Sequence, residues 1–170
     1  MKLLLSLLTL FFISASFPQE VKEKENSLLT YAQTKMSINN YVDMVRALEI
    51  GERYFKTDKD IVLAVLYIES DFNVFAYNQE TNDYGLSQQN GKYILDRYTI
   101  VKEILDKERI ECNINHRFNI YLNVLACYYY LDHCIELKGS KSQGIKKYNG
   151  IGVRAELYMY KVIDIYFKNV

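Results

Sequence analysis

The strongest constraint on the fold is an uninterrupted apolar run, IVLAVLYI, at residues 61–68. A segment that is apolar all the way round is normally buried in the middle of a domain. The run is short enough to be a buried strand instead. Thr57 and Asp58 supply an N-cap candidate before it, and neither Gly nor Pro flanks it, which favours a helix. The sequence therefore predicts a central helix on which the other elements pack.

Helical spacing also dominates the rest of the chain. At residues 38–55, apolar side chains recur at steps of three and four, as on one face of an amphipathic helix. Further helices are predicted at 93–107, 118–137, 142–147 and 153–167. A single Pro and seven Gly disfavour a turn-rich β architecture, and 170 residues suit one domain. We predict a mainly α fold, with one helical domain over residues 38–170.

Residues 71–91 interrupt this helical pattern. Asn, Asp, Gln, Thr and Gly cluster there, and Asn82, Asp83 and Gly85 are turn formers. Loops longer than about 12–15 residues in compact domains are usually functional. We expect a long loop or small hairpin that lines a site directly after the central helix.

The N-terminus has the pattern of an export signal. Lys2 gives a positive start, an apolar run follows, and small residues end at Ser16. The run is short for a membrane span, which needs about 20 residues. We predict a signal peptide at residues 1–16, cleaved after Ser16, with an uncleaved anchor as the alternative. The expected location is the periplasm or cell envelope.

Charge argues against nucleic acid as a partner. The 21 basic and 21 acidic residues give a formal net charge of zero, and no segment is dominated by Lys or Arg. Between Glu20 and Asn26 the charges alternate in sign, which is typical of a solvated segment. Residues 17–37 are therefore predicted to be a linker and N-terminal extension.

The cysteines and histidines indicate neither a metal site nor a catalytic thiol. Cys127 and Cys134 are about 10 Å apart along a helix, which exceeds the usual Cα separation of a disulfide. Either Cys112 pairs with one of them, or all three are free thiols. His116 and His133 lack the spacing of zinc ligands. We expect no metal and no cofactor.

Glu69, which directly follows the apolar run, is the candidate catalytic acid. It continues the stripe of Val62, Val65 and Leu66 at helical spacing, and burial raises the pKa of a carboxyl. The C-terminal end of a helix also disfavours an anion. Both effects favour a protonated carboxyl near neutral pH, the state that a glycosidase general acid needs. The alternative is a side chain that bends into solvent as the helix ends.

The residues around Glu69 resemble the catalytic segment of lytic transglycosylases. In that family a Glu-Ser pair is followed by an aromatic residue, an Ala, a small polar residue and Gly-Leu-Met-Gln. The matching residues are Glu69-Ser70, Phe72, Ala76, Asn78 and Gly85-Leu86-Ser87-Gln88. Further blocks are similar to Asn119-Ile120, Tyr130-Leu131, Lys147-Tyr148-Asn149-Gly150, and Tyr158 with Val162. These blocks occur in the order and with the spacing of the family, and the resemblance extends over about residues 58–165.

The resemblance implies a lysozyme-like domain with a groove for a peptidoglycan strand. In the family one Glu protonates the oxygen between MurNAc and GlcNAc. It then takes the proton of the MurNAc C6 hydroxyl, which closes onto C1 as a 1,6-anhydro ring. The substrate's acetamido group stabilises the cationic centre, so no second carboxylate is needed. By position, Glu69 matches the acid/base, Ser70 and Asn78 polar residues near it, Gln88 and Asn149 amides for the N-acetyl groups, and Tyr148 the tyrosine that reaches the Glu.

The sequence departs from the family pattern at several positions. Asn78 replaces a Ser, Ser87 replaces a Met, and Lys147 replaces an Ala. Gln88 also lies one residue further from Glu69 than is usual.

Two alternative functions remain open on this sequence. A lysozyme-type hydrolase on the same fold would use water, positioned by a second carboxylate such as Glu80 or Asp83. A catalytically inactive wall-binding or assembly protein would keep the groove without the reaction.

Overall fold

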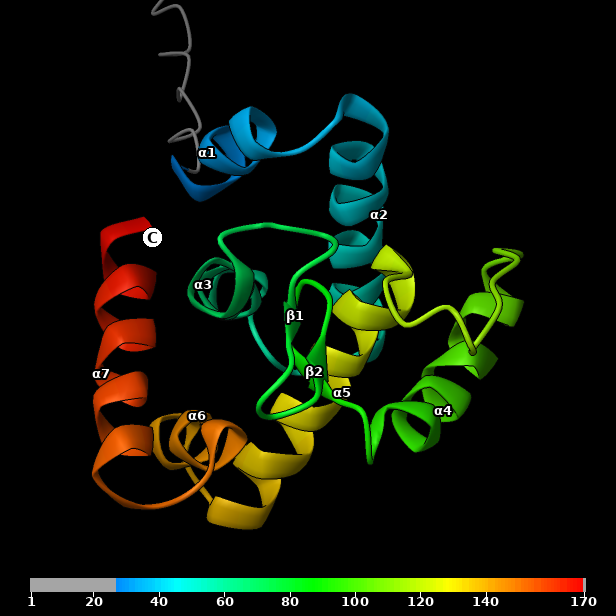
Figure 1. Cartoon of the computed structure of the whole chain (residues 1–170). Coiled ribbons are helices and arrows are strands. Elements are labelled where there is room, and N and C mark those ends of the chain that lie inside the picture. Colours follow the sequence, from blue (N-terminus) through cyan, green and yellow to red (C-terminus); the bar gives the residue numbers. More distant parts are fainter. Residues whose placement is uncertain (1–26, 170) are drawn as a thin grey trace, which may run out of the picture.

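The protein is mainly helical, as predicted. A computed structural model describes residues 27–169, so the predicted signal peptide and the first part of the predicted linker, residues 17–26, lie outside the described residues. Within this range the chain forms seven helices and a three-stranded antiparallel sheet (Figure 1). The elements are α1 (Ser27–Lys35), α2 (Ile38–Tyr54), α3 (Lys59–Ser70), β1 (Tyr77–Asn78), β2 (Asp83–Tyr84), β3 (Gln89–Asn90), α4 (Ile94–Lys107), α5 (Ile120–Lys138), α6 (Lys141–Asn149) and α7 (Gly152–Asn169).

The apolar run forms the central helix α3, and the strand alternative is wrong. Every residue from Ile61 to Leu66 is at most 2% exposed. In Figure 1, α3 is viewed nearly end-on, with α7 beside it and α1 above it. The helices α1, α2, α5 and α7 all contact it. Asp58 caps the helix by accepting a hydrogen bond from the backbone N–H of Asp60 at 2.9 Å, as the Thr57-Asp58 pair predicts.

Helix α1 belongs to the same core, although the sequence places it in the linker. Leu28 and Ala32 are buried with the side chains of α3. These two residues lie one helical turn apart, so a single face of α1 covers the flank of the central helix. The domain boundary predicted after residue 37 is therefore too late, because the packed unit already includes α1.

The segment after α3 is a small sheet rather than a single hairpin. Its three two-residue strands pair in the order β1-β2-β3. Asp71 and Phe72 have φ values of 51° and 60°, in the left-handed region, and turn the chain back as soon as α3 ends. Phe72 is fully buried, and this burial offsets the cost of the unusual backbone. The chain thus reverses direction within one turn of Glu69, and β1 begins at Tyr77.

Asn123, a buried polar residue of α5, fixes the far end of this segment. Its Nδ2 donates to the Tyr98 hydroxyl at 2.6 Å and to the carbonyl of Arg117 at 2.9 Å. The Ser87 hydroxyl in turn donates to the carbonyl of Asn123 at 2.9 Å. Gly85 has a φ of 74°, and a Cβ there would lie 2.4 Å from Asn123 Oδ1. Only glycine allows this approach, which holds the segment against α5.

The cysteines are free thiols, one of the two arrangements predicted. Cys127 and Cys134 are buried on α5, and Cys112 is half-buried between α4 and α5. In residues 27–169, no three His, Cys, Asp or Glu side chains lie close enough together to hold a metal ion.

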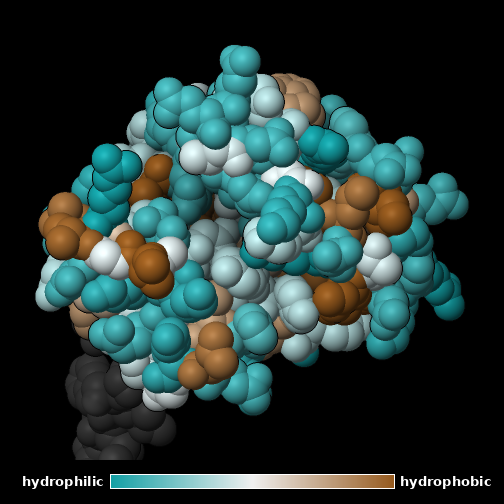
Figure 2. Space-filling model, turned by 60° about the horizontal axis from the view of Figure 1, so that its bottom comes forward, coloured by the Kyte–Doolittle hydropathy of each residue, from teal (hydrophilic) through white to brown (hydrophobic). Residues whose placement is uncertain are grey.

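The surface is largely hydrophilic on the face shown in Figure 2, where hydrophobic side chains form separate small groups. Of the helices in the described part of the chain, none is both long enough and apolar enough to cross a membrane.

Helix α6 packs closely on α5 because Gly144 faces Ile135. A Cβ at position 144 would lie 2.4 Å from Ile135 Cγ1 and 2.6 Å from its Cα. The Cα cannot move aside as a flexible side chain can. This contact determines how closely α6 approaches α5, and so where the C-terminal end of α6, with Tyr148 and Asn149, lies.

We predict that Gly144→Ala lowers the free energy of unfolding. Overpacking typically costs about 1–3 kcal/mol. The better helix propensity of Ala returns up to about 1 kcal/mol, so the net effect is a loss. Gln143→Ala, at an exposed position on the same helix, is the matched control and should change stability by less than about 0.5 kcal/mol. Urea denaturation measures both, and equal stability of Gly144→Ala and wild type would contradict the close contact.

Candidate active site

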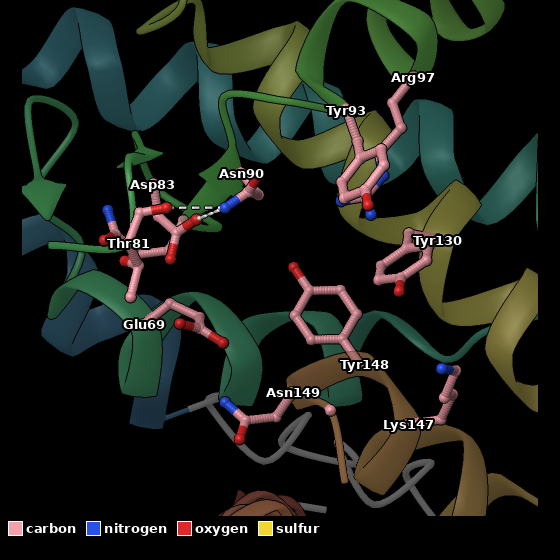
Figure 3. Close-up of a pocket in the computed structure, with 12 residues that line it drawn as sticks. Glu69, Thr81, Asp83, Asn90, Tyr93, Arg97, Tyr130, Lys147, Tyr148 and Asn149 are labelled. Carbon is pink, nitrogen blue, oxygen red and sulfur yellow. Dashed lines mark hydrogen bonds between the residues drawn. The ribbon is translucent and has the colours of Figure 1, made fainter. Parts of the chain in front are cut away.

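The end of α3, the sheet, α4, α5 and the end of α6 surround a pocket of about 360 Å³ (Figure 3). Four of the predicted site residues line it: Glu69, Gln88, Tyr148 and Asn149. The other lining residues are Thr81, Asp83, Asn90, Tyr93, Arg97, Tyr130, Lys147 and Gly150.

Glu69 lies in the last turn of α3 and has the acid character predicted for it. Burial raises the pKa of its carboxyl from 4.5 to about 7. The Tyr158 hydroxyl donates to Glu69 Oε1 at 2.7 Å and opposes this rise, whereas the negative charge of Asp83 adds to it. The alternative of a side chain extended into solvent is wrong. Near neutral pH the carboxyl exchanges its proton readily, as an acid/base catalyst requires.

The tyrosine that contacts Glu69 is Tyr158, and the prediction that Tyr148 reaches it is wrong. The Tyr148 hydroxyl instead donates to the carbonyl of Ser87 at 3.0 Å and accepts from Gln89 Nε2 at 3.2 Å. The rings of Tyr148 and Tyr158 are stacked, with centroids 6.4 Å apart and an interplanar angle of 10°. Tyr148 therefore supports the ring of the tyrosine that binds the carboxyl.

Two predicted substrate contacts, Ser70 and Asn78, do not line the pocket. The Ser70 hydroxyl donates to the carbonyl of Leu86 at 2.8 Å and ties the end of α3 to the sheet segment. Asn78 is exposed on β1, and its Oδ1 accepts from the backbone N–H of Glu80 at 3.1 Å. Both side chains shape the segment beside the pocket rather than the pocket itself.

Gln88 and Asn149 line the pocket, as predicted. Gln88 has a φ of 45°, and its Nε2 donates to the carbonyls of Ala76 at 3.2 Å and Gly85 at 3.0 Å. These bonds fix its carboxamide in one orientation. Asn149 is exposed at the end of α6, and Figure 3 shows its side chain on the same side of the pocket as Glu69.

One wall of the pocket is acidic. Asn90 Nδ2 donates to Asp83 Oδ1 at 2.8 Å and to the carbonyl of Thr81 at 2.8 Å, as the dashed lines in Figure 3 show. This fixes Asp83 near Glu69, whose pKa it raises. Of the two carboxylates considered for a hydrolase, Asp83 lines the pocket and Glu80 does not.

The opposite wall is aromatic and basic, and most of its residues were not predicted from the sequence as site residues. Arg97 Nη1 donates to Gln89 Oε1 at 2.6 Å, and the guanidinium lies 3.6 Å from the centroid of the Tyr130 ring. Gln89 is fully buried and connects Arg97 to Tyr148. A weak signal did exist, because Arg97 comes one helical turn after Ile94 and so borders the apolar stripe of α4.

Comparisons with protein families, with curated proteins and with solved structures find no match to this chain. The chemistry of the site is therefore inferred from its geometry and from the motif residues that it brings together.

The raised pKa of Glu69 predicts how stability depends on pH. Below about pH 4.5 the carboxyl is protonated in the folded and the unfolded chain alike. As pH rises toward 7, the unfolded chain releases this proton and the folded chain retains it, so the free energy of unfolding falls. At about 1.4 kcal/mol per pH unit, the loss amounts to up to about 3 kcal/mol.

Glu69→Gln removes this titration and should cancel the corresponding fall. Urea denaturation of wild type and variant from pH 4 to 8 measures the difference. It should grow in favour of Glu69→Gln between about pH 4.5 and 7. Parallel stability profiles would contradict the burial of the carboxyl.

The Tyr158 hydroxyl favours the ionised form of Glu69, so Tyr158→Phe should raise the pKa of Glu69 further. Carboxyl-carbon NMR of labelled protein follows this titration directly. Tyr160→Phe is the matched control, because Tyr160 lies on the same helix and is 57% exposed. A pKa that stays the same or falls in Tyr158→Phe would contradict the observed hydrogen bond.

Proposed function

We propose that this protein is an exported lytic transglycosylase with a lysozyme-like fold. It cleaves the β-1,4 bond between MurNAc and GlcNAc in peptidoglycan and leaves 1,6-anhydro-MurNAc. The observation that supports this most strongly is the Glu69 carboxyl, with a pKa of about 7, in a pocket that also contains Gln88, Tyr148 and Asn149 of the motif blocks.

The proposed reaction uses Glu69 in two steps. The carboxyl first donates its proton to the glycosidic oxygen, and the bond from that oxygen to MurNAc C1 breaks. The resulting carboxylate then accepts the proton of the MurNAc C6 hydroxyl as O6 bonds to C1. The protonated carboxyl is regenerated and no water is consumed. A pKa of about 7 suits both steps, since a general acid/base works best near the operating pH.

The neighbouring residues have distinct roles in this reaction. The Tyr158 hydroxyl, 2.7 Å from Glu69 Oε1, stabilises the carboxylate formed in the first step. Gln88 and Asn149 offer amide groups to the N-acetyl groups of the sugars, which an apolar surface could not orient. Tyr148 and Tyr130 provide ring faces along the wall of the pocket.

A lysozyme-type hydrolase is the second candidate, and the position of Asp83 favours it. This carboxylate lines the same pocket as Glu69, and its orientation is fixed by Asn90. In a hydrolase Asp83 would orient the water that attacks C1. The products then carry reducing ends instead of anhydro ends.

The proposed substrate requires the protein to reach the periplasm or cell envelope, where glycan strands lie. The predicted signal peptide at residues 1–16 would supply this route.

We predict that the mature protein releases muropeptides ending in 1,6-anhydro-MurNAc from purified peptidoglycan, detected by mass spectrometry. Glu69→Gln removes both proton transfers, and loss of general acid catalysis alone typically costs about 10²–10⁴-fold. Turnover should therefore fall at least about 10³-fold. Binding of strands without cleavage by wild type would instead support a wall-binding protein. Substantial cleavage by folded Glu69→Gln would show that another residue is the acid.

Asp83→Asn separates the two enzymatic candidates. In a transglycosylase, the variant should keep anhydro products. Its pH profile should shift to lower pH, because Asp83 raises the pKa of Glu69. In a hydrolase, the variant should lose most activity at every pH, and the wild-type products should have reducing ends.

A further inference from the structure

The wall of the pocket opposite Glu69 and Asp83 has two cationic side chains, Arg97 from α4 and Lys147 from α6. Figure 3 shows the acidic residues on one side, these two on the other, and Tyr148 between them. The charges within the pocket are thus separated. A neutral sugar strand alone would not require this separation.

Neither cation forms an ion pair with a carboxylate of the described residues. The ion pairs formed within residues 27–169 involve other Lys and Arg side chains, and none includes Arg97 or Lys147. By contrast, the adjacent Lys146 lies outside the pocket and pairs with Glu156 at 3.3 Å. Arg97 and Lys147 are half-buried, face one cavity and have no acidic partner in the described part of the chain, so an anion can bind them without breaking an existing ion pair.

Arg97 is held in place for such a contact. The Tyr130 ring covers one face of its guanidinium at 3.6 Å, and the bond to Gln89 fixes one nitrogen. A guanidinium has five N–H donors, and the bond to Gln89 uses only one of them. Since Arg97 already loses much of its freedom in the folded protein, binding an anion costs little additional entropy.

We infer that Arg97 and Lys147 form a subsite for a carboxylate carried by the substrate next to the bond that is cleaved. This inference rests on the proposed function, because MurNAc is the sugar of the strand that bears a lactyl ether and, through it, a peptide. An attached peptide ends in a carboxylate, and the lactyl group itself has a free carboxylate where no peptide is attached, whereas GlcNAc has none. The subsite therefore distinguishes the two sugars and sets which of them lies on the Glu69 side of the pocket.

Lys147 gives this subsite a basis in the sequence. It replaces the Ala of the matched family block, directly before Tyr148. The substitution adds a cation to the pocket wall without changing Tyr148 or Asn149. Selection for carboxylated strands is thus a property of this chain.

Binding to the mature Glu69→Gln protein tests the subsite without turnover. Calorimetry should compare three ligands of equal length: glycan fragments with peptides, the same fragments after an amidase has removed the peptides, and a chitin oligosaccharide, which has no carboxylate. We expect both carboxylated ligands to bind more tightly than chitin, and salt to weaken the preference. A loss of affinity on amidase treatment assigns the subsite to the peptide carboxylates, and a gain assigns it to the lactyl carboxylate that the amidase frees.

Lys147→Met, added to Glu69→Gln, should lower the preference for carboxylated strands over chitin about fivefold, the effect of one partly exposed ion pair. Arg97→Gln should do the same. Lys146→Met is the matched control and should leave the preference unchanged. Equal affinity for all three ligands, or an equal effect of the two Lys substitutions, would overturn the inference.

Cleavage by wild type is a separate measurement. Cleavage without any carboxylate preference would leave the proposed enzyme intact and reject the subsite. A carboxylate preference without cleavage would reject the proposed reaction and leave the subsite intact.

Discussion

The burial of α3 on every side organises both the fold and the site. Four helices contact this element, and its residues from Ile61 to Leu66 are buried, whereas those of its last turn are half-buried. Glu69 lies at that turn. Its carboxyl is buried enough to disfavour a negative charge, and it also lines the pocket, where a ligand can reach it. The apolar run that stabilises the domain therefore also leads to the raised pKa of the carboxyl at its end.

Helix α5 has the complementary role, because two walls of the pocket, the sheet segment and α6, are attached to it. The sheet segment is attached through Asn123 and Ser87, and α6 through the contact of Gly144 with Ile135. One helix thus determines the separation between the wall near Glu69 and the end of α6.

Features governed by periodicity could be predicted from the sequence, and those governed by the approach of two distant helices could not. The burial of α3 and the raised pKa of Glu69 follow from an apolar run and from the carboxyl directly after it. The choice between Tyr148 and Tyr158 depends on how α6 packs against α7, and local spacing does not encode this. Similarly, Ser70 stands beside Glu69 in sequence, yet its hydroxyl points to Leu86. The packing of α1 on the core was not predicted, because the charged residues that precede this helix indicated a solvated linker.

The contact between Tyr158 and Glu69 also determines when the carboxyl acquires its buried environment during folding. Tyr158 belongs to α7, the last helix that the structure describes, and α7 covers one flank of α3. A chain still emerging from the ribosome delivers α3 before α7. Until α7 docks, the carboxyl has neither its hydroxyl partner nor its full screen from water. The environment that raises the pKa of Glu69 is thus complete only once α7 has packed on α3.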